Sequence, residues 1–203
     1  MKNERVKGAP LPRAFYHCDP RDVAPQLLNK VLVRGQRTGR IVEVEAYCGS
    51  IDPGSHAYRG QTARNATMFA RPGLLYVYFT YGMHFCANAV CGDEGEGVAV
   101  LLRGLTPLTG LAQMRRNRPV ARRDADLCNG PAKLCAAFGL DRAFDGADIV
   151  RGDRGVVIAD DGTPPPLEPI VTRRIGLAPG RGDETPWRFV VPGALGVSRR
   201  ISR

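Results

Sequence analysis

LLYVYFTYGMHFCANAVC, residues 74–91, decides the fold of this chain. Apolar and aromatic residues alternate on both sides of Gly82, which is typical of two strands joined in a hairpin. The tip carries Tyr81, Met83 and His84, whereas hairpin tips are usually polar and easily solvated. Three large side chains there would expose apolar surface to water unless something else covers them. We therefore expect a hairpin whose tip is covered by a partner.

Further strand-like and helix-like segments lie on both sides of this hairpin. Apolar patterning predicts strands at residues 31–34, 40–47, 97–105, 156–160, 171–177 and 187–191. Helix-start chemistry and periodicity predict helices after Asp19-Pro20, over residues 106–118, and after Gly130-Pro131. Strands that neighbour one another in sequence, with the helices kept apart, indicate an α+β fold with a mostly antiparallel sheet. We expect a single domain over residues 1–203, with residues 1–14 as a loose basic arm.

The composition fits one globular domain with a polyanionic partner. A chain of 203 residues with 43% hydrophobic and 24% charged residues can bury a core and is not expected to be disordered. Lys and Arg number 29 against 20 Asp and Glu, which gives a net charge of +9. Such an excess favours nucleic acid, ribosomal RNA or an anionic membrane surface as partner, although a basic protein without such a partner also fits the charge.

Neither a membrane span nor a metal site is predicted. No run approaches the roughly 18 apolar residues that a span needs, and the N-terminus lacks the apolar core of a signal peptide, so we expect a cytoplasmic protein. The six cysteines form no C-x-x-C pair and the three histidines are scattered, which favours buried reduced thiols over disulfides or zinc. We predict no metal and no cofactor.

RIVEVEAY, residues 40–47, has one plainly apolar face. A period of two places Val42, Val44 and Ala46 together, and their side chains predict a face directed into the core.

The opposite face of the same strand carries Glu43, Glu45 and Tyr47. A solvated outer face is one interpretation of this pattern. The other is a functional site, because glutamate is disfavoured in strands and a pair of them needs partners or a task. Arg103, in the segment VAVLLRG, offers a fixed cation that could orient a carboxylate or share a water with it.

The two hairpin strands carry further candidates. Alternation separates Tyr76 and Tyr78 from their apolar neighbours, and such tyrosines are more often core or sheet surface than ligand platforms. Asn88 lies among apolar residues on the returning strand, so its amide needs a hydrogen-bond partner.

Several uncommon segments together resemble the alkyladenine (3-methyladenine) DNA glycosylase family, in that family's order. They are RIVEVEAY, SHAYRGQTARNATMF, GLLYVYFTYGMHFCANAV, VAVLLRGLTPLTGL, CNGPAKLC, RIGL and PWRFVV. The resemblance runs from about residue 12 to about residue 193, and it is specific because the segments occur in combination. It implies a compact α+β domain with a curved sheet, flanking helices and a protruding hairpin, acting as a monomer on double-stranded DNA of the nucleoid.

The resemblance also implies an activity. A monofunctional glycosylase of this kind hydrolyses the N-glycosidic bond of alkylated purines such as 3-methyladenine and 7-methylguanine and leaves an abasic site; activity on hypoxanthine and ethenoadenine stays open. Glu45 corresponds to the catalytic carboxylate, which activates a water, while Arg103 and the carbonyl of Ile175 correspond to groups that hold that water. Glu43 has no catalytic counterpart and is interpreted as a structural partner.

In such a protein the damaged base leaves the helix and enters an aromatic pocket. Tyr47 and Tyr78 correspond to its stacking walls, His56 closes it, and Asn88 corresponds to a residue that obstructs the amino group of normal guanine.

The family resemblance gives the hairpin tip a partner, the base stack of DNA. Tyr81 corresponds to the residue that fills the gap left by the extruded nucleotide, and Met83 and His84 flank it. Phosphate contacts are expected from Lys133, Arg64 and Asn65.

Two other functions are compatible with the residues alone. A non-catalytic basic RNA-binding module explains the charge and the aromatic residues but not a glutamate opposite Arg103. A metal-dependent nuclease using Glu43 and Glu45 would need divalent cations and further acids nearby.

Overall fold

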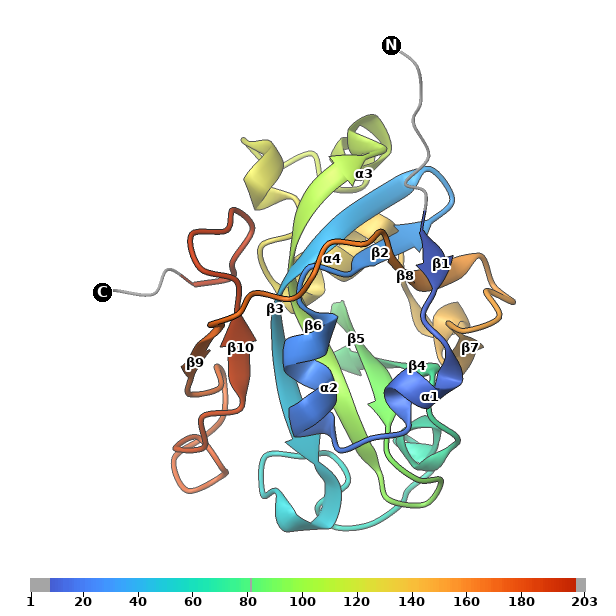
Figure 1. The fold of residues 1–203 in the computed structure, drawn as a ribbon, viewed down its shortest axis with the longest axis vertical. Helices are drawn as coiled ribbons and strands as arrows, with labels where there is room; N and C mark the ends of the chain where they lie inside the picture. Colours follow the sequence, from blue (N-terminus) through green and yellow to red (C-terminus); the bar gives the residue numbers. More distant parts are fainter. Residues whose placement is uncertain (1–7, 81, 200–203) are drawn as a thin grey trace.

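A curled antiparallel sheet of ten strands organises the chain (Figure 1). The computed structural model describes residues 8–80 and 82–199. The strands are β1 (Ala9–Pro10), β2 (Val31–Arg34), β3 (Arg37–Cys48), β4 (Leu74–Thr80), β5 (His84–Cys91), β6 (Val98–Thr109), β7 (Ala147–Asp148), β8 (Val156–Asp160), β9 (Ile170–Thr172) and β10 (Arg188–Val190). All strand pairs among the described residues are antiparallel, so the predicted α+β class with a mostly antiparallel sheet is confirmed.

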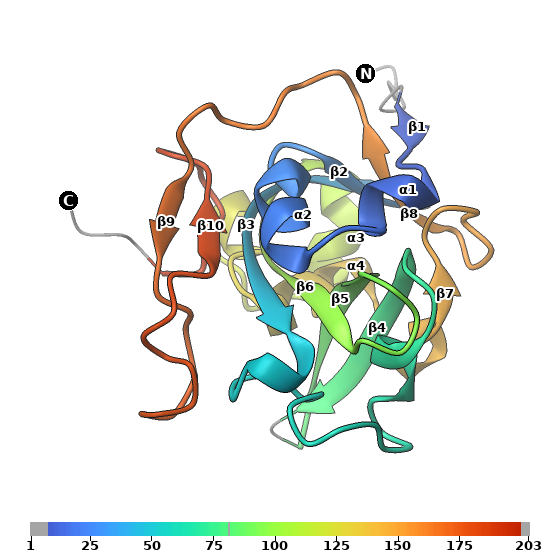
Figure 2. The same cartoon turned by 60° about the horizontal axis from the view of Figure 1, so that its bottom comes forward.

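Strand β3 is the axis of this sheet. Along one edge it pairs with β6 from Thr38 to Cys48. Its other edge is shared, since the first half pairs with β2 and residues Glu43 to Glu45 pair with β10. Figure 2 shows β9 and β10 as a small pair standing beside β3, away from the rest of the sheet. This arrangement brings the C-terminal part of the chain onto the strand that carries both glutamates.

The helices are short. They are α1 (Arg13–Tyr16), α2 (Pro20–Leu27), α3 (Leu111–Asn117) and α4 (Pro131–Phe138), with single 3-10 turns η1 (Gly49–Ile51), η2 (Ala66–Phe69), η3 (Asp124–Asp126) and η4 (Arg142–Phe144). The predicted start of α2 is confirmed, because the Asp19 carboxylate accepts a hydrogen bond from the Arg21 amide at 2.8 Å and Pro20 is the first helical residue. Across the residues that the structure describes, no helix is long and apolar enough to cross a membrane.

The helix predicted over residues 106–118 begins later than expected. Strand β6 continues to Thr109, because the long partner strand β3 offers pairing positions as far as Thr38. Gly110 then turns the chain in the left-handed region (φ +73°), where a side chain would also collide with the backbone of Gln36. The helix α3 starts only after this turn.

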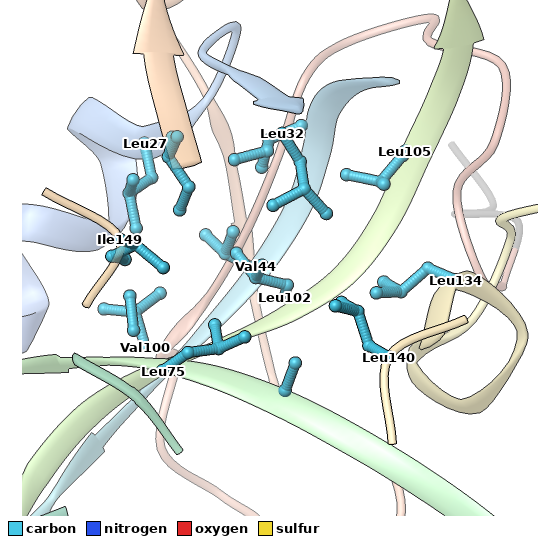
Figure 3. Packing of buried hydrophobic residues seen from close by; sticks show 14 of the residues in the cluster. Leu27, Leu32, Val44, Leu75, Val100, Leu102, Leu105, Leu134, Leu140 and Ile149 are labelled. Carbon is cyan, nitrogen blue, oxygen red and sulfur yellow. The ribbon is translucent and has the colours of Figure 1, made fainter. Parts of the chain in front are cut away.

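The larger of two hydrophobic clusters forms the core inside the curl of the sheet. Helix α2 packs on β3 and β6, and α4 packs on β5 and β6. Figure 3 shows side chains from both helices and from the strands meeting there: Leu27, Leu32, Val44, Leu75, Val100, Leu102, Leu105, Leu134, Leu140 and Ile149. The cluster fixes the curvature of the sheet and with it the position of the hairpin β4–β5.

Two predictions about local structure need correction. Residues 8–14 are not a loose arm, because Ala9 and Pro10 pair with β8, Leu11 is buried and Arg13 begins α1. Residues 1–7 lie outside the described part of the chain.

The apolar face of β3 also departs from simple alternation. Val42, Val44 and Ala46 are all buried, as predicted, but Ile41 and not Val42 joins Val44 and Ala46 in the main core cluster. The cause is an irregularity in the register with β6 between Ile41 and Glu43, which shifts the face by one residue.

The cysteines are free thiols. Five of them are buried, as predicted, and Cys18 alone is exposed.

Candidate active site

A cavity of about 330 Å³ opens between the hairpin, the end of β3, β6 and the loop that follows β9. Its lining consists of Tyr47, Gly54, His56, Met68, Tyr76, Tyr78, Thr80, Cys86, Asn88, Leu101, Arg103, Pro131, Ile175, Gly176 and Leu177. The structure thus brings six of the predicted site residues together from segments more than 120 positions apart in the sequence, and the volume is in the range of small-molecule sites.

Glu45 lies directly beneath this lining and is fully buried. The Ile175 backbone amide donates a hydrogen bond to Oε1 at 2.7 Å, whereas the Tyr47 hydroxyl (2.9 Å) and the Arg103 guanidinium (3.1 Å) donate to Oε2. The interpretation of this strand face as solvated is therefore wrong. A carboxylate has about four acceptor positions, so three donors leave one position open.

The protonation of Glu45 reflects two opposing effects. Burial raises the pKa of the Glu45 carboxyl above its ordinary value, and the neighbouring Arg103 charge works in the opposite direction. The net direction is upward. Glu45 is therefore a stronger base than an exposed glutamate, held in place by fixed donors.

Glu43 has a different environment from Glu45. It accepts hydrogen bonds from Arg103 Nε at 3.0 Å, from Arg188 Nε at 2.7 Å and from both the amide and the hydroxyl of Ser198. Although burial opposes it, these donors hold the pKa of Glu43 below its ordinary value, with Arg103 as the largest of them. These contacts agree with the interpretation of Glu43 as a structural partner, and Arg103 is the residue that the two glutamates share.

Aromatic rings form the walls of the cavity. His56 meets the Tyr78 ring edge-on, with centroids 4.4 Å apart, and its Nδ1 lies 3.2 Å from the Tyr76 hydroxyl. Tyr76 and Tyr78 stack at 5.4 Å with their planes 25° apart. Burial lowers the pKa of His56, so its imidazole is neutral near pH 7. Tyr76, which the sequence suggested as a core residue, is both buried and part of this wall.

Arg174 packs on one face of the Tyr47 ring and fixes its position. The guanidinium carbon of Arg174 lies 4.7 Å from the centroid of the Tyr47 ring. Arg174 also makes two ion-pair contacts of 2.6 Å with Asp52, and the side chains of both residues are fully buried. One face of Tyr47 is therefore occupied, which leaves the other face for a ligand.

Asn88 has the partner that its position requires. Its side-chain amide donates to the Tyr76 carbonyl at 3.2 Å, which fixes the group at the cavity wall. Of the catalytic candidates, Ile175 contributes its amide to Glu45, and the predicted role of its carbonyl stays a prediction.

The hairpin tip is exposed and apolar, although Tyr81 lies outside the described residues. Met83 is 71% exposed, Phe79 is 44% exposed, and His84 is exposed beside them. The ring of Phe79 is supported by Phe85, with centroids 5.2 Å apart.

The three residues predicted to contact phosphates differ in their exposure to solvent. Lys133 is exposed at the start of α4 and donates to the Asn129 side chain at 2.8 Å, and Arg64 is exposed and donates to the Phe79 carbonyl at 3.0 Å. Asn65 is 3% exposed, and its amide group is bonded to the backbone of residues 56, 60 and 62. The prediction for Asn65 is wrong, because a buried amide that fixes its own loop cannot reach a phosphate.

Sequence reasoning missed four residues that complete the site: Arg174, Asp52, Arg188 and Ser198. The two arginines stand in RIGL and PWRFVV, segments that already carried the family resemblance, so they could have been suspected. Asp52 and Ser198 carry no comparable signal.

A second cavity, of about 630 Å³, lies by the junction of α1 and α2 and the turn between β5 and β6. Its polar lining includes His17, Asp19, Asp93 and Glu96, which are surface groups. It contains none of the predicted site residues. Within residues 8–80 and 82–199, no group of three or more His, Cys, Asp or Glu side chains is placed to hold a metal ion, and both candidate glutamates of the nuclease hypothesis are instead held by arginines.

Comparison with known proteins agrees with this geometry. A family model described as "Methylpurine-DNA glycosylase (MPG)" matches residues 14–195. Proteins named "Putative 3-methyladenine DNA glycosylase" are similar over most of the chain. The relative from Burkholderia lata is 54% identical over 98% of this chain and 96% of its own length, and the one from Streptomyces avermitilis is 49% identical over 89% and 86%. The alternative of a non-catalytic RNA-binding module is therefore wrong, and the chain belongs to the methylpurine-DNA glycosylase family of N-glycosyl hydrolases acting on DNA.

Proposed function

We propose that the protein removes alkylated purines from double-stranded DNA by hydrolysing the N-glycosidic bond with a water that Glu45 activates. The observation that carries this proposal is the placement of Glu45, a fully buried carboxylate with three fixed donors, beneath an aromatic cavity. In this proposal the protein acts on DNA as a monomer.

The open acceptor position of Glu45 is where the attacking water would bind. The carboxylate takes a proton from this water as its oxygen attacks C1′ of the deoxyribose, and the bond from C1′ to the base nitrogen breaks. The negative charge of Glu45 stabilises the oxocarbenium character that develops on the sugar. Arg103 and Ile175 hold the carboxylate in one orientation through their hydrogen bonds at 3.1 and 2.7 Å.

The aromatic walls favour purines that carry a positive charge. A base such as 3-methyladenine or 7-methylguanine would lie between the free face of Tyr47 and Tyr78, where cation–π attraction contributes roughly 1–2 kcal/mol. His56 is neutral, since burial lowers its pKa, and it does not repel a cationic base. Asn88, fixed by its bond to the Tyr76 carbonyl, is placed to obstruct the amino group of normal guanine.

Access to the cavity requires the damaged nucleotide to rotate out of the duplex. The apolar tip of the hairpin supports this step, because Met83 and Phe79 offer exposed surface that stacked bases would cover. In this proposal Tyr81 fills the vacated position, His84 flanks it, and the exposed Arg64 and Lys133 meet phosphates.

Base release from methylated duplex DNA tests this function directly. We expect the purified protein to release free 3-methyladenine and 7-methylguanine in the presence of EDTA and to leave the strand intact until it is treated with alkali. Borohydride should trap no protein–DNA adduct, since a water nucleophile forms no Schiff base. Loss of release on chelation, or a trapped adduct, would contradict the mechanism.

The pH dependence of base release follows from the raised pKa of Glu45. The general base must be ionised, so single-turnover release should be slow at acidic pH and rise with pH through the Glu45 pKa. Because burial raises that pKa, the acid limb should lie above the ordinary glutamate value of about 4.3.

The limb should persist in a His56→Gln variant, because the His56 pKa is lowered and the ring stays neutral across the limb's upper part. If the limb disappears with His56, it does not report Glu45.

A further inference from the structure

The segment that follows β10 lies against the ion network that holds Glu45. It continues from β10, drawn in red at the left of Figure 1. The family model ends at residue 195, so Gly196 to Arg199 lie beyond the residues that it matches.

Close backbone packing fixes this segment on β6. The Thr106 hydroxyl donates to the Leu195 carbonyl. Gly196 has φ +92° and lies so close to β6 that a side chain on it would collide with the Leu105 carbonyl, while a side chain on Gly104 would meet the Gly196 carbonyl at 2.5 Å. Two facing glycines thus allow the segment to approach the strand that carries Arg103.

Ser198 is placed by this approach between Glu43 and Arg103. Its backbone amide and its hydroxyl both donate to Glu43, the hydroxyl at 2.7 Å. The same hydroxyl oxygen accepts a hydrogen bond from Arg103 NH2 at 3.2 Å. One side chain therefore supplies a donor to the first glutamate and an acceptor to the shared arginine.

The two glutamates compete for Arg103. Its Nε is directed to Glu43 at 3.0 Å and its NH1 to Glu45 at 3.1 Å. A buried carboxylate that lacks donors attracts any neighbouring cation more strongly. Ser198 supplies two hydrogen-bond donors to Glu43, which weakens the attraction of Glu43 for Arg103. The Ser198 hydroxyl oxygen also accepts a hydrogen bond from Arg103 NH2, which keeps NH1 directed to Glu45.

We propose that Ser198 is a positioning residue for the hydrolysis, directing Arg103 towards Glu45 although it is not part of the cavity lining. This inference rests on the proposed function of Glu45 as the general base. It predicts a change in chemistry and in the titration of Glu45, and no change in the affinity for the lesion.

Three variants test the proposal in single-turnover assays on methylated duplex DNA. Ser198→Ala removes the hydroxyl, Ser198→Thr keeps it, and Leu195→Ala is a matched control in the same segment, because that side chain is 68% exposed. We expect Ser198→Ala to slow base release about tenfold, in the range found when outer partners of a site are removed. Its acid limb should move to higher pH, since Glu45 loses part of the stabilisation that Arg103 gives to its charge. Ser198→Thr should restore both properties, and Leu195→Ala should change neither.

Separate measurements distinguish a positioning role from mere packing. Lesion affinity should be the same for all three variants. Ser198→Ala should lower the melting temperature modestly, because the buried Glu43 loses one hydrogen-bond donor, so the assays are run well below that temperature. A Gly196→Ala variant, in which the new side chain displaces the segment, should reproduce the shifted limb of Ser198→Ala by an independent route.

A slower Ser198→Ala protein with an unmoved acid limb would overturn the positioning role, as would an unchanged rate. Absence of base release from the wild-type protein would instead overturn the proposed function itself.

Discussion

Glu45→Gln is expected to lower the rate of base excision by about 10²–10⁴-fold, the range that a positioned general base contributes. The change removes the proton acceptor and the negative charge beneath the cavity while it keeps the size of the side chain. Binding to lesion-containing duplex should be retained, because the walls formed by Tyr47, Tyr78 and His56 are unchanged. Single-turnover release and equilibrium binding, measured on the same DNA, separate the two effects.

A matched substitution controls for this experiment. Glu94→Gln removes one negative charge from an exposed position in the turn between β5 and β6 and should leave excision unchanged. The melting temperature of Glu45→Gln should be recorded as well, because Arg103 loses one of its two carboxylate partners. If lesion binding falls in step with activity while the protein stays folded, Glu45 serves binding and the general-base role is wrong.

Asp52→Ala is expected to destabilise the fold by about 3–5 kcal/mol, the cost of leaving one member of a buried ion pair without its partner. The side chains of Asp52 and Arg174 are both fully buried, and the two contacts between them are 2.6 Å long. The pair joins the loop after β3 to the segment after β9, and Arg174 supports the Tyr47 ring. Chemical denaturation with a fixed m value measures the loss.

An exposed ion pair in the same region provides the control. Arg173 and Glu184 are 2.5 Å apart, with side chains 67% and 68% exposed, so Glu184→Ala should change stability by no more than about 0.5 kcal/mol. The double variant Asp52→Ala/Arg174→Ala should lose less stability than the sum of the two single variants, because it leaves no uncompensated charge. Equal losses for Asp52→Ala and Glu184→Ala would show that burial does not decide the strength of the pair.

The sequence by itself determined the local elements and most of the candidate site. The alternation in residues 74–91 predicted the hairpin, because a period of two is a property of neighbouring residues. The pattern of β3 placed Val44 and Ala46 in the core and Glu45 and Tyr47 on the opposite face. The family resemblance, carried by short segments, named the residues that the fold then gathered around one cavity.

Only the tertiary structure decided how these elements end and what covers the glutamates. Strand β6 extends to Thr109 because β3 provides partners for it, and no local pattern records the length of a partner strand. Asn65 is polar and lies in a loop, so the sequence suggested that it could contact DNA. In the structure its side-chain amide is occupied by hydrogen bonds within its own loop.

The glutamates are buried by residues far along the chain. Arg188 and Ser198, separated from Glu43 by 145 and 155 positions, reach it only because β10 pairs with β3 and the final segment packs on β6. Local sequence specifies which face of a strand a side chain occupies, but whether that face meets water or other side chains depends on long-range pairing. For this reason the two glutamates were compatible with a solvated surface until the fold placed arginines beside them.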